Sequence, residues 1–476
     1  MGGGRKVDRG GGRGRDGRRP VVAVLWGDAP KNAGDPAMLE CAIEGLRDAI
    51  EGVEIVVLSA EGAEPRLGSD VRHAAALDRY LFPSRRGAGG IGSRCRRLIL
   101  GVRAGWLLLN AFLYRAGYGT LALGRAGKDF LQTLSDSDLL YNAGGGNLNE
   151  YWPRNELYPK CLSYLTAWAL ARPVVLSGQT IGPLEGTAKR LLLRTSLKCV
   201  QCVALRDGEQ SASFLRSLGF RHPGVAITGD EAISLALPAK DVIDEVFRGE
   251  GLPTSGLRIG INLRDPGDMG IGGAPTELGR LLASTLDRII QNTGARLVFI
   301  PLDTAAGEDD RVFMDQVLSA MSRADVVRTV RGEYPPGVIK GLIARMDAQV
   351  GMAYHSLLFA LSAGVPAVGL YAGQYYRMKI RGLFEMFEME GLAIRLTSEA
   401  DVGAAERAVT YVLREQRGLR RAAIDRTGRL ASSARWPIEV ARRLIVEEGR
   451  GMEARRGAVG ANTSEPATRR GCVGLR

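Results

Sequence analysis

The amino-acid sequence predicts an α/β fold with two doubly wound domains that face each other across a cleft. The length of 476 residues suits about two domains, and an apolar content of 45% is enough for two cores without disulfide bridges. Short apolar runs alternate with helical patterns in both halves, which is typical of parallel sheets covered by helices. In chain order we expect a disordered basic leader (1–20), a first domain (21–237), a linker (238–256), a second domain with closing helices (257–448) and a disordered tail (449–476).

The first half contains about six apolar runs that indicate the strands of one sheet. They cover residues 21–26, 53–59, 138–142, 174–177, 202–205 and 225–228. Helical patterns separate most of them, so successive strands are expected to lie parallel. Residues from about 85 to 130 interrupt the alternation and are interpreted as a helical insertion.

Polar or glycine-rich loops follow several of these strands, at the edge where open α/β sheets bind ligands. Asp35 begins the first helix, where it either caps the helix or contacts a substrate. Three consecutive glycines after the strand at 138–142 let a ligand approach the backbone closely. Arg206 is either a cleft residue or a surface residue of the helix that follows. The candidates for the first domain's side of the cleft are Asn32, Gly144, Gly145, Gly146, Asn147, Gln179 and Arg206, with Asp35 and Asp230 as candidate bases.

The second half repeats the alternation. Strands are expected at 257–263, 296–301, 325–329 and 348–352 and again after Pro366, with helices at 276–293 and 308–321. His355 follows the fourth of these strands in a tight turn, with Ser356 as the expected N-cap of a helix whose positive end favours an anion. Arg264, Arg377 and Lys379 lie in loops after strands and are candidate anion-binding residues. A helical run over 399–448 can cross back onto the first domain.

The composition indicates the cellular compartment and the kinds of partner that the protein meets. Six cysteines without a paired framework and the lack of an apolar segment after the basic start indicate a reducing, cytoplasmic environment. The net charge of +12 suits anionic small molecules or an anionic membrane surface. Residues 98–114 read either as a buried helix or helical hairpin, or as a basic, Trp-bearing helix that contacts a membrane surface from the inner face. The Gly- and Arg-rich leader resembles an RNA-binding arm, but a solvated leader is favoured, and no nucleic-acid partner is expected.

Metal binding is not expected. Cys199 and Cys202 form a lone CxxC without a second pair or a nearby histidine. Asp136 and Asp138 match the DxD pattern of metal-using sugar transferases, but any Asp-rich entry to a strand does the same. We therefore expect no metal and no cofactor.

Seven short motifs in order resemble the polysaccharide pyruvyl transferase family, over roughly residues 21–395. They are NAGD (32–35), YNAGGGNL (141–148), SGQTIGP (177–183), LRD with a following Ser (205–211), TGDEA (228–232), INLR (261–264) and YHSLLFALSAGVP (354–366). The two Rossmann-like domains then correspond to a GT-B-like architecture. The resemblance implies transfer of a carboxyvinyl unit from the co-substrate phosphoenolpyruvate to a sugar or lipid-linked glycan of an exopolysaccharide or cell envelope, usually leaving a pyruvate ketal.

One position departs from the family pattern. The family usually has an arginine two residues before the histidine, and this chain has Ala353. Because the donor carries a phosphate and a carboxylate, cations must hold it, and Arg264, Arg377 and Lys379 are the expected replacements. His355 is expected to act as acid or base, to bind phosphate while protonated, or to be a structural residue of the turn. The rival functions are a nucleotide-sugar glycosyltransferase of the same architecture and a non-catalytic glycan-binding relative; the acceptor sugar and the oligomeric state stay open.

Overall fold

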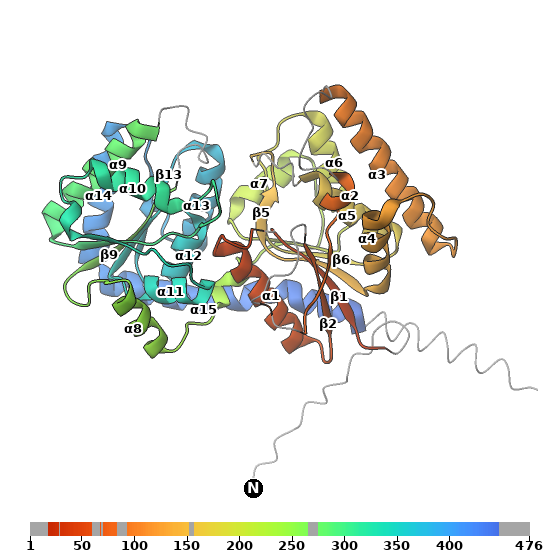
Figure 1. Cartoon of the computed structure of the whole chain (residues 1–476), viewed down its shortest axis with the longest axis horizontal. Coiled ribbons are helices and arrows are strands. Elements are labelled where there is room, and N and C mark those ends of the chain that lie inside the picture. Colours follow the sequence, from red (N-terminus) through yellow and green to blue (C-terminus); the bar gives the residue numbers. More distant parts are fainter. Residues whose placement is uncertain are drawn as a thin grey trace, which may run out of the picture.

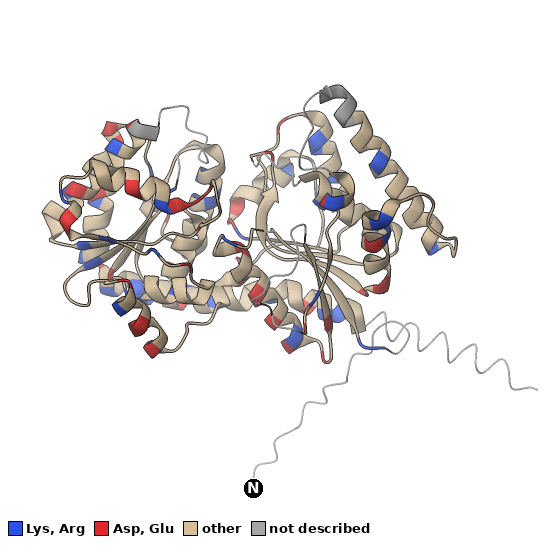
Figure 2. Cartoon of the chain, viewed as in Figure 1, with Lys and Arg blue, Asp and Glu red and all other residues tan. Residues whose placement is uncertain are grey.

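The computed structural model describes residues 18–27, 29–59, 67, 70–82, 93–151, 157–264 and 275–446. Two α/β domains lie side by side, each with a sheet covered by helices (Figure 1). Basic and acidic side chains are interspersed over most helices of both domains (Figure 2). The expectations for residues 1–17 of the leader and for the tail at 449–476 lie outside the described residues.

In the described part of the first domain, the sheet is entirely parallel, in the order β3-β2-β1-β4-β6-β7-β8, with β5 paired to β6. Its strands are β1 (Val21–Leu25), β2 (Glu54–Ser59), β3 (Arg72–Ala75), β4 (Leu139–Asn142), β5 (Gly145–Leu148), β6 (Val174–Ile181), β7 (Cys202–Leu205) and β8 (Val225–Ile227). Its helices are α1 (Gly34–Ala49), α2 (Asp78–Leu81), α3 (Ser93–Arg115), α4 (Gly124–Asp136), α5 (Leu157–Ala169), α6 (Thr187–Leu197) and α7 (Glu209–Ser217), followed by the 3-10 turn η3 (Glu231–Ser234). The strand order changes direction between β1 and β4, so the loops after these strands open a crevice.

The second domain has a parallel sheet in the order β11-β10-β9-β12-β13-β14. Its strands are β9 (Arg258–Asn262), β10 (Arg296–Phe299), β11 (Val327–Thr329), β12 (Ala348–Gly351), β13 (Ala367–Tyr371) and β14 (Ala393–Arg395). Its helices are α8 (Lys240–Gly249), α9 (Pro275–Thr293), α10 (Asp310–Ala320), α11 (Pro336–Ala344), α12 (Tyr354–Ser362), α13 (Gly373–Phe387), α14 (Glu399–Arg414) and α15 (Gln416–Ala434), with the 3-10 turns η5 (Ala324–Val326) and η6 (Glu390–Leu392). The change of direction falls between β9 and β12, so this domain offers a second crevice. The predicted doubly wound, GT-B-like pair of domains is confirmed.

Three local expectations differ from the structure. Residues 238–256, expected as a linker, contain α8, whose Ile243 and Phe247 are buried in the core of the second domain. The N-cap of α12 is Ala353, and Ser356 lies inside the helix, where its buried hydroxyl accepts a hydrogen bond from Gln349. The expected loop after β13 is helix α13, so its tyrosines and cations are distributed around a helix.

The closing helices cross back onto the first domain, as expected. In Figure 1 the C-terminal helices run beneath both domains. Residues 436–446 are helical, and Ile438, Ala441 and Ile445 pack in one buried cluster with Val22 and Val24 of β1. The C-terminal helix therefore connects the two domains a second time, in addition to the chain segment between β8 and β9.

Candidate active site

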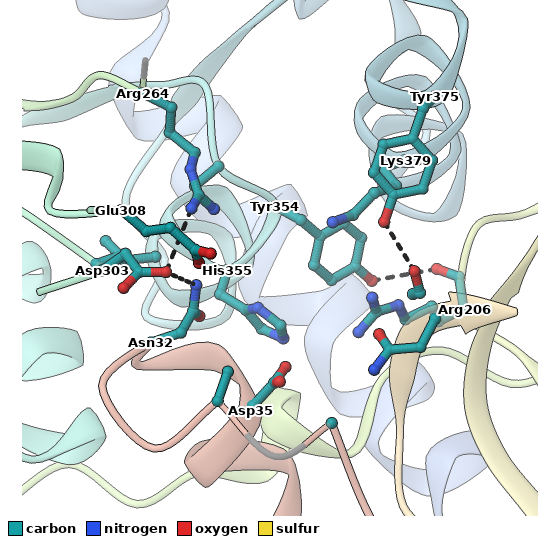
Figure 3. A pocket seen from close by; sticks show the side chains of 16 residues that line it. Asn32, Asp35, Arg206, Arg264, Asp303, Glu308, Tyr354, His355, Tyr375 and Lys379 are labelled. Atoms are coloured by element: carbon teal, nitrogen blue, oxygen red, sulfur yellow. Dashed lines mark hydrogen bonds and ion pairs between the residues drawn. The ribbon is translucent and has the colours of Figure 1, made fainter. Parts of the chain in front are cut away.

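The two crevices meet in one cleft between the domains. The first domain contributes the loop after β1, the start of α1, strand β5 and the residue after β7. The second domain contributes the segments after β9 and β10, the start of α12, and α13 (Figure 3). The cleft contains about 830 Å³ of space, including the part that opens to solvent. Its lining comprises Gly27, Ala29, Asn32, Asp35, Gly146, Asn147, Arg206, Arg264, Leu302, Asp303, Glu308, Ala353, Tyr354, His355, Tyr375 and Lys379.

His355 lies in the first turn of α12 and is only 7% exposed. Its imidazole ring fills the space beside Gly34, where a Cβ atom would lie 1.9 Å from Nδ1. Its Nε2 lies 3.5 Å from Oδ2 of Asp230. Burial lowers the pKa of His355 below 6.5, although the carboxylate of Asp230 opposes the shift. The ring is therefore neutral at neutral pH and is held at the positive end of a helix.

Asp230 lies behind the cleft lining and forms an ion pair with Arg206, which belongs to the lining. The Nη1 atom of Arg206 donates to Oδ2 of Asp230 at 2.5 Å, and both side chains are buried. The guanidinium also lies 4.5 Å from the centre of the Tyr354 ring. Burial by itself would raise the pKa of Asp230, but Arg206 and His355 lower it to about 2. Asp230 thus stays ionised beside its two partners, and a carboxylate with so low a pKa is a weak base.

Asp35 is the carboxylate that lines the cleft opposite His355 (Figure 3). It lies in the first turn of α1, whose N-cap residue is Ala33, so the interpretation of Asp35 as an N-cap is wrong. A Cβ atom on Gly27 would lie 2.1 Å from its Oδ2, so only glycine fits there. Burial raises the pKa of Asp35 to about 6, against the nearby cations Lys160, Arg206 and Lys379. Asp35 can therefore gain or lose a proton close to neutral pH.

Lys379 brings a positive charge into the cleft from α13. Its Nζ atom lies 5.0 Å from the ring centre of Tyr375 and 5.9 Å from those of Tyr354 and Tyr376. Burial, together with the nearby cations Arg206 and Arg264, lowers the pKa of Lys379 to about 7. Among the described residues, no carboxylate lies within ion-pair distance of this amine. The site can therefore accept an anion beside Lys379.

Arg264 supplies a second cation at the end of β9. Its Nη2 lies 3.4 Å from Oδ2 of Asp303, and its Nε lies 3.6 Å from Oδ1 of Asp310. Asp303 also accepts a hydrogen bond from Nδ2 of Asn32 at 2.9 Å. Arg264 is consequently held at the cleft by carboxylates of its own domain, and Asn32 joins the two domains at the same point.

Metal ligation has no support in the described residues. No group of three or more His, Cys, Asp or Glu side chains within them is close enough to hold a metal ion. The carboxylate of Asp138 accepts a hydrogen bond from the backbone of Val21, and Cys199 and Cys202 are free thiols.

A model of the family described as "Polysaccharide pyruvyl transferase" matches residues 32–373, which is most of the chain. The chain belongs to the polysaccharide pyruvyl transferase family. No curated protein matches it. Among solved structures, it resembles a glycosyltransferase from Rickettsia africae ESF-5 (10% identity, TM-score 0.50, 94% of this chain and 100% of the other). It also resembles a UDP-GlcNAc 2-epimerase from Neisseria meningitidis bound to UDP-GlcNAc (12% identity, TM-score 0.50, 89% and 99%). At these identities the likenesses concern the fold alone.

The position where this family usually has an arginine is occupied by Ala353, at the edge of the cleft. Ala353 is buried and lines the cleft, and its backbone N–H donates to Oδ1 of Asn262. Of the three expected replacement cations, Arg264 and Lys379 line the cleft. Arg377 is exposed on another face of α13 and does not line it. In this family member the second domain thus presents Arg264 and Lys379 to the cleft.

The expected loops of the first domain are only partly in the cleft. Asn32, Gly146, Asn147 and Arg206 line it. The backbone N–H of Gly144 donates instead to the buried Glu231, and Gln179 is buried and donates to the carbonyls of Ala143 and Ser177. Gly144, Gly145, Gln179 and Ser356 therefore support the lining from behind and do not contact the cleft.

Several lining residues were not singled out in the sequence. Asp303 and Glu308 follow β10, whose carboxyl end is a ligand edge of the second sheet. Tyr375 is another such residue, and its hydroxyl donates to the carbonyl of Gly146 at 3.0 Å across the cleft. Gly34 was treated as part of a motif, although the packing of His355 depends on it.

Proposed function

We propose that this protein transfers a carboxyvinyl unit from phosphoenolpyruvate to a sugar hydroxyl and closes it into a pyruvate ketal. Membership of the polysaccharide pyruvyl transferase family supports a transferase that acts on a glycan. The observation that carries the choice of donor is Lys379, a partly buried cation in the cleft that has no carboxylate within ion-pair distance among the described residues. A small dense anion such as phosphoenolpyruvate would supply the missing negative charge.

The donor binds with its phosphate between Lys379 and the N-terminus of α12. The positive end of a helix and a lysine together are a common phosphate site. Arg264 faces the same space and is partly neutralised by Asp303 and Asp310, so in this proposal it contacts the carboxylate of the donor. These two cations take over the function of the arginine that the family has at the position of Ala353.

The acid and the base are divided between the domains. Asp35, with a pKa of about 6 that a bound anion raises further, donates its proton to the methylene carbon of the donor. The neutral His355 accepts the proton of the attacking sugar hydroxyl, and a bond forms between that oxygen and the central carbon. Asp230 stabilises the imidazolium that results.

The ketal closes in a second step. The bond from the central carbon to the phosphate oxygen breaks, and His355 returns its proton to the leaving phosphate. A second hydroxyl of the same sugar attacks the carbon, and its proton returns to Asp35. One phosphoenolpyruvate and one sugar with two free hydroxyls thus give one ketal and one inorganic phosphate, without a cofactor or a metal in the scheme.

A comparison of ligands tests the proposed donor. The melting temperature of the full chain is measured with phosphoenolpyruvate, UDP and GDP, and binding is then quantified by calorimetry. We expect stabilisation by phosphoenolpyruvate. Stabilisation by a nucleotide alone would instead indicate a nucleotide-sugar transferase.

A second experiment tests the reaction. Release of phosphate and formation of a ketal are followed with a panel of sugar and glycan acceptors. The variant His355→Ala should bind the donor without turnover, and His222→Ala, in the first domain outside the cleft lining, is the matched control. Donor binding without turnover by any acceptor in the wild-type chain would favour a non-catalytic glycan-binding protein.

A further inference from the structure

Helix α3 turns an apolar face to solvent. Leu98, Val102, Trp106, Leu109 and Phe112 are 70%, 64%, 37%, 45% and 44% exposed. Their spacing of three or four residues places them in one stripe along the helix. A stripe of this kind usually faces the core of a soluble protein, so its exposure requires an explanation.

Two polar side chains of α3, Arg103 and Asn110, face the protein instead. The guanidinium of Arg103 donates to the carbonyls of Tyr80 and Leu81, at 3.3 Å and 2.8 Å. Asn110 is fully buried and accepts a hydrogen bond from the backbone of Leu121 at 2.6 Å. The helix therefore has apolar residues on two faces, because Leu107 and Ala111 pack in the core while the stripe remains in solvent.

Neighbouring residues extend the apolar surface. Tyr118, Leu121 and Trp168 are each about half exposed or more, and the rings of Phe112 and Trp168 pack edge-on with centroids 5.8 Å apart. Tryptophan and tyrosine are the side chains that prefer the boundary between lipid and water. We call the stripe of α3 together with these three residues the α3 patch.

The charged residues of α3 itself have one sign. Residues 93–115 include five arginines and no aspartate or glutamate. In Figure 2, α3 carries blue segments and no red ones. A second copy of this helix would bring arginines against arginines, whereas an anionic surface complements them.

We propose that the α3 patch docks on the surface of a bilayer that contains anionic lipids. Within the described part of the chain, Leu98–Arg115 is the one helix long and apolar enough to cross a membrane. Crossing would remove Arg103 and Asn110 from their buried partners, however, and would detach Leu107 and Ala111 from the core. The helix therefore lies in the interface with its outer stripe in the lipid.

This orientation puts the side of the first domain that carries α3 against the membrane, and in Figure 1 this side faces away from the second domain. Helix α3 packs on α5, and α5 follows the segment that carries Gly146 and Asn147 in the cleft lining. The inference concerns the surface alone and does not depend on the donor or the reaction.

Flotation of the full chain with lipid vesicles tests the proposal. Vesicles of phosphatidylcholine with phosphatidylglycerol are compared with vesicles of phosphatidylcholine alone. The double variant Val102→Glu, Leu109→Glu changes only the stripe, and Val312→Glu, which is 60% exposed on α10 of the second domain, is the matched control. We expect the wild type and the control to bind anionic vesicles, and the double variant to bind at least about tenfold less tightly, since binding scales with buried apolar area.

A second readout does not depend on the double variant. Lipids brominated in their acyl chains should quench the fluorescence of the wild type, and the variant Trp106→Phe should lose a part of this quenching. Equal vesicle binding by the wild type and the double variant would overturn the proposal. A dimer in solution that the double variant converts to a monomer would also overturn it, in favour of a second copy as the partner.

Discussion

Replacement of Lys379 by methionine tests the centre of the proposed donor site. Methionine keeps the length of the side chain and its contact with the three tyrosine rings, but it removes the charge. A hydrogen bond to a charged group contributes about 1.5–3 kcal/mol. The affinity for phosphoenolpyruvate should therefore fall about 10- to 150-fold. Arg377→Met, an exposed position two residues earlier on the same helix, is the control and should bind normally.

The same variant makes a prediction about pH. In the free protein, burial and the cations Arg206 and Arg264 lower the pKa of Lys379 from 10.5 to about 7. A bound phosphate raises that pKa, so binding above pH 7 must take up a proton. The affinity of the wild type should consequently fall as the pH rises from 7 to 9, by up to about tenfold per unit. Below pH 7 the amine is already protonated, and this contribution is constant.

Calorimetry measures both effects. Titrations at pH 7, 8 and 9 in buffers of different ionisation enthalpy give the affinity and the number of protons taken up. His355 is neutral over this range, because its pKa lies below 6.5. Lys379→Met should lose the proton uptake along with the affinity. Wild-type affinity in the variant, or an unchanged pH dependence, would refute the assignment of Lys379 to the donor.

Three further variants test the proposed base His355, the proposed acid Asp35, and Gly34, against which the imidazole ring packs. His355→Ala should lower turnover by about 10²- to 10⁴-fold with donor binding retained, as measured by phosphate release and calorimetry. Asp35→Asn should lower turnover by a similar factor and remove the change in rate near pH 6 from the pH profile; a profile that keeps this change would contradict its assignment. Gly34→Ala should displace the imidazole and lower turnover, whereas Gly101→Ala, beside open space, should not.

The alternation of strands and helices was predictable because each buried strand is a short apolar run. The missed strands lack this signal. β3 has the sequence RHAA and is half-exposed at the edge of the sheet, β5 begins with two glycines, and β14 has three residues. Their pairing depends on neighbouring strands rather than on their own composition. Residues 238–256, in contrast, contain a signal that the linker interpretation overlooked, since Ile243 and Phe247 are spaced as on one face of a helix.

Site residues that come shortly after a predicted strand could be identified from the sequence. Asp35, Arg264 and His355 were found in this way because carboxyl ends of parallel strands meet at one edge. Arg377 was misplaced because α13 was taken as a loop; on a helix, Tyr375, Tyr376 and Lys379 share a face that Arg377 does not. The ion pair of Arg206 with Asp230 joins residues from two successive strands, and its effect on the pKa of Asp230 depends on burial that no local pattern reveals.

In the proposed mechanism the acid, Asp35, belongs to the first domain and the base, His355, to the second. The two domains must therefore keep their relative position at the cleft. If the domains separated, Asp35 and His355 would no longer lie near each other, and His355 would leave the space that it fills beside Gly34. Hydrogen bonds from Tyr354 to the carbonyl of Arg206 and from Tyr375 to that of Gly146 span the cleft at 3.2 Å and 3.0 Å. The helix at 436–446 adds an apolar tie on the first sheet, away from the lining of the cleft. Because polar contacts at the cleft and apolar packing behind it resist the same motion, the proposed acid, Asp35, stays beside the proposed base, His355, before any ligand binds.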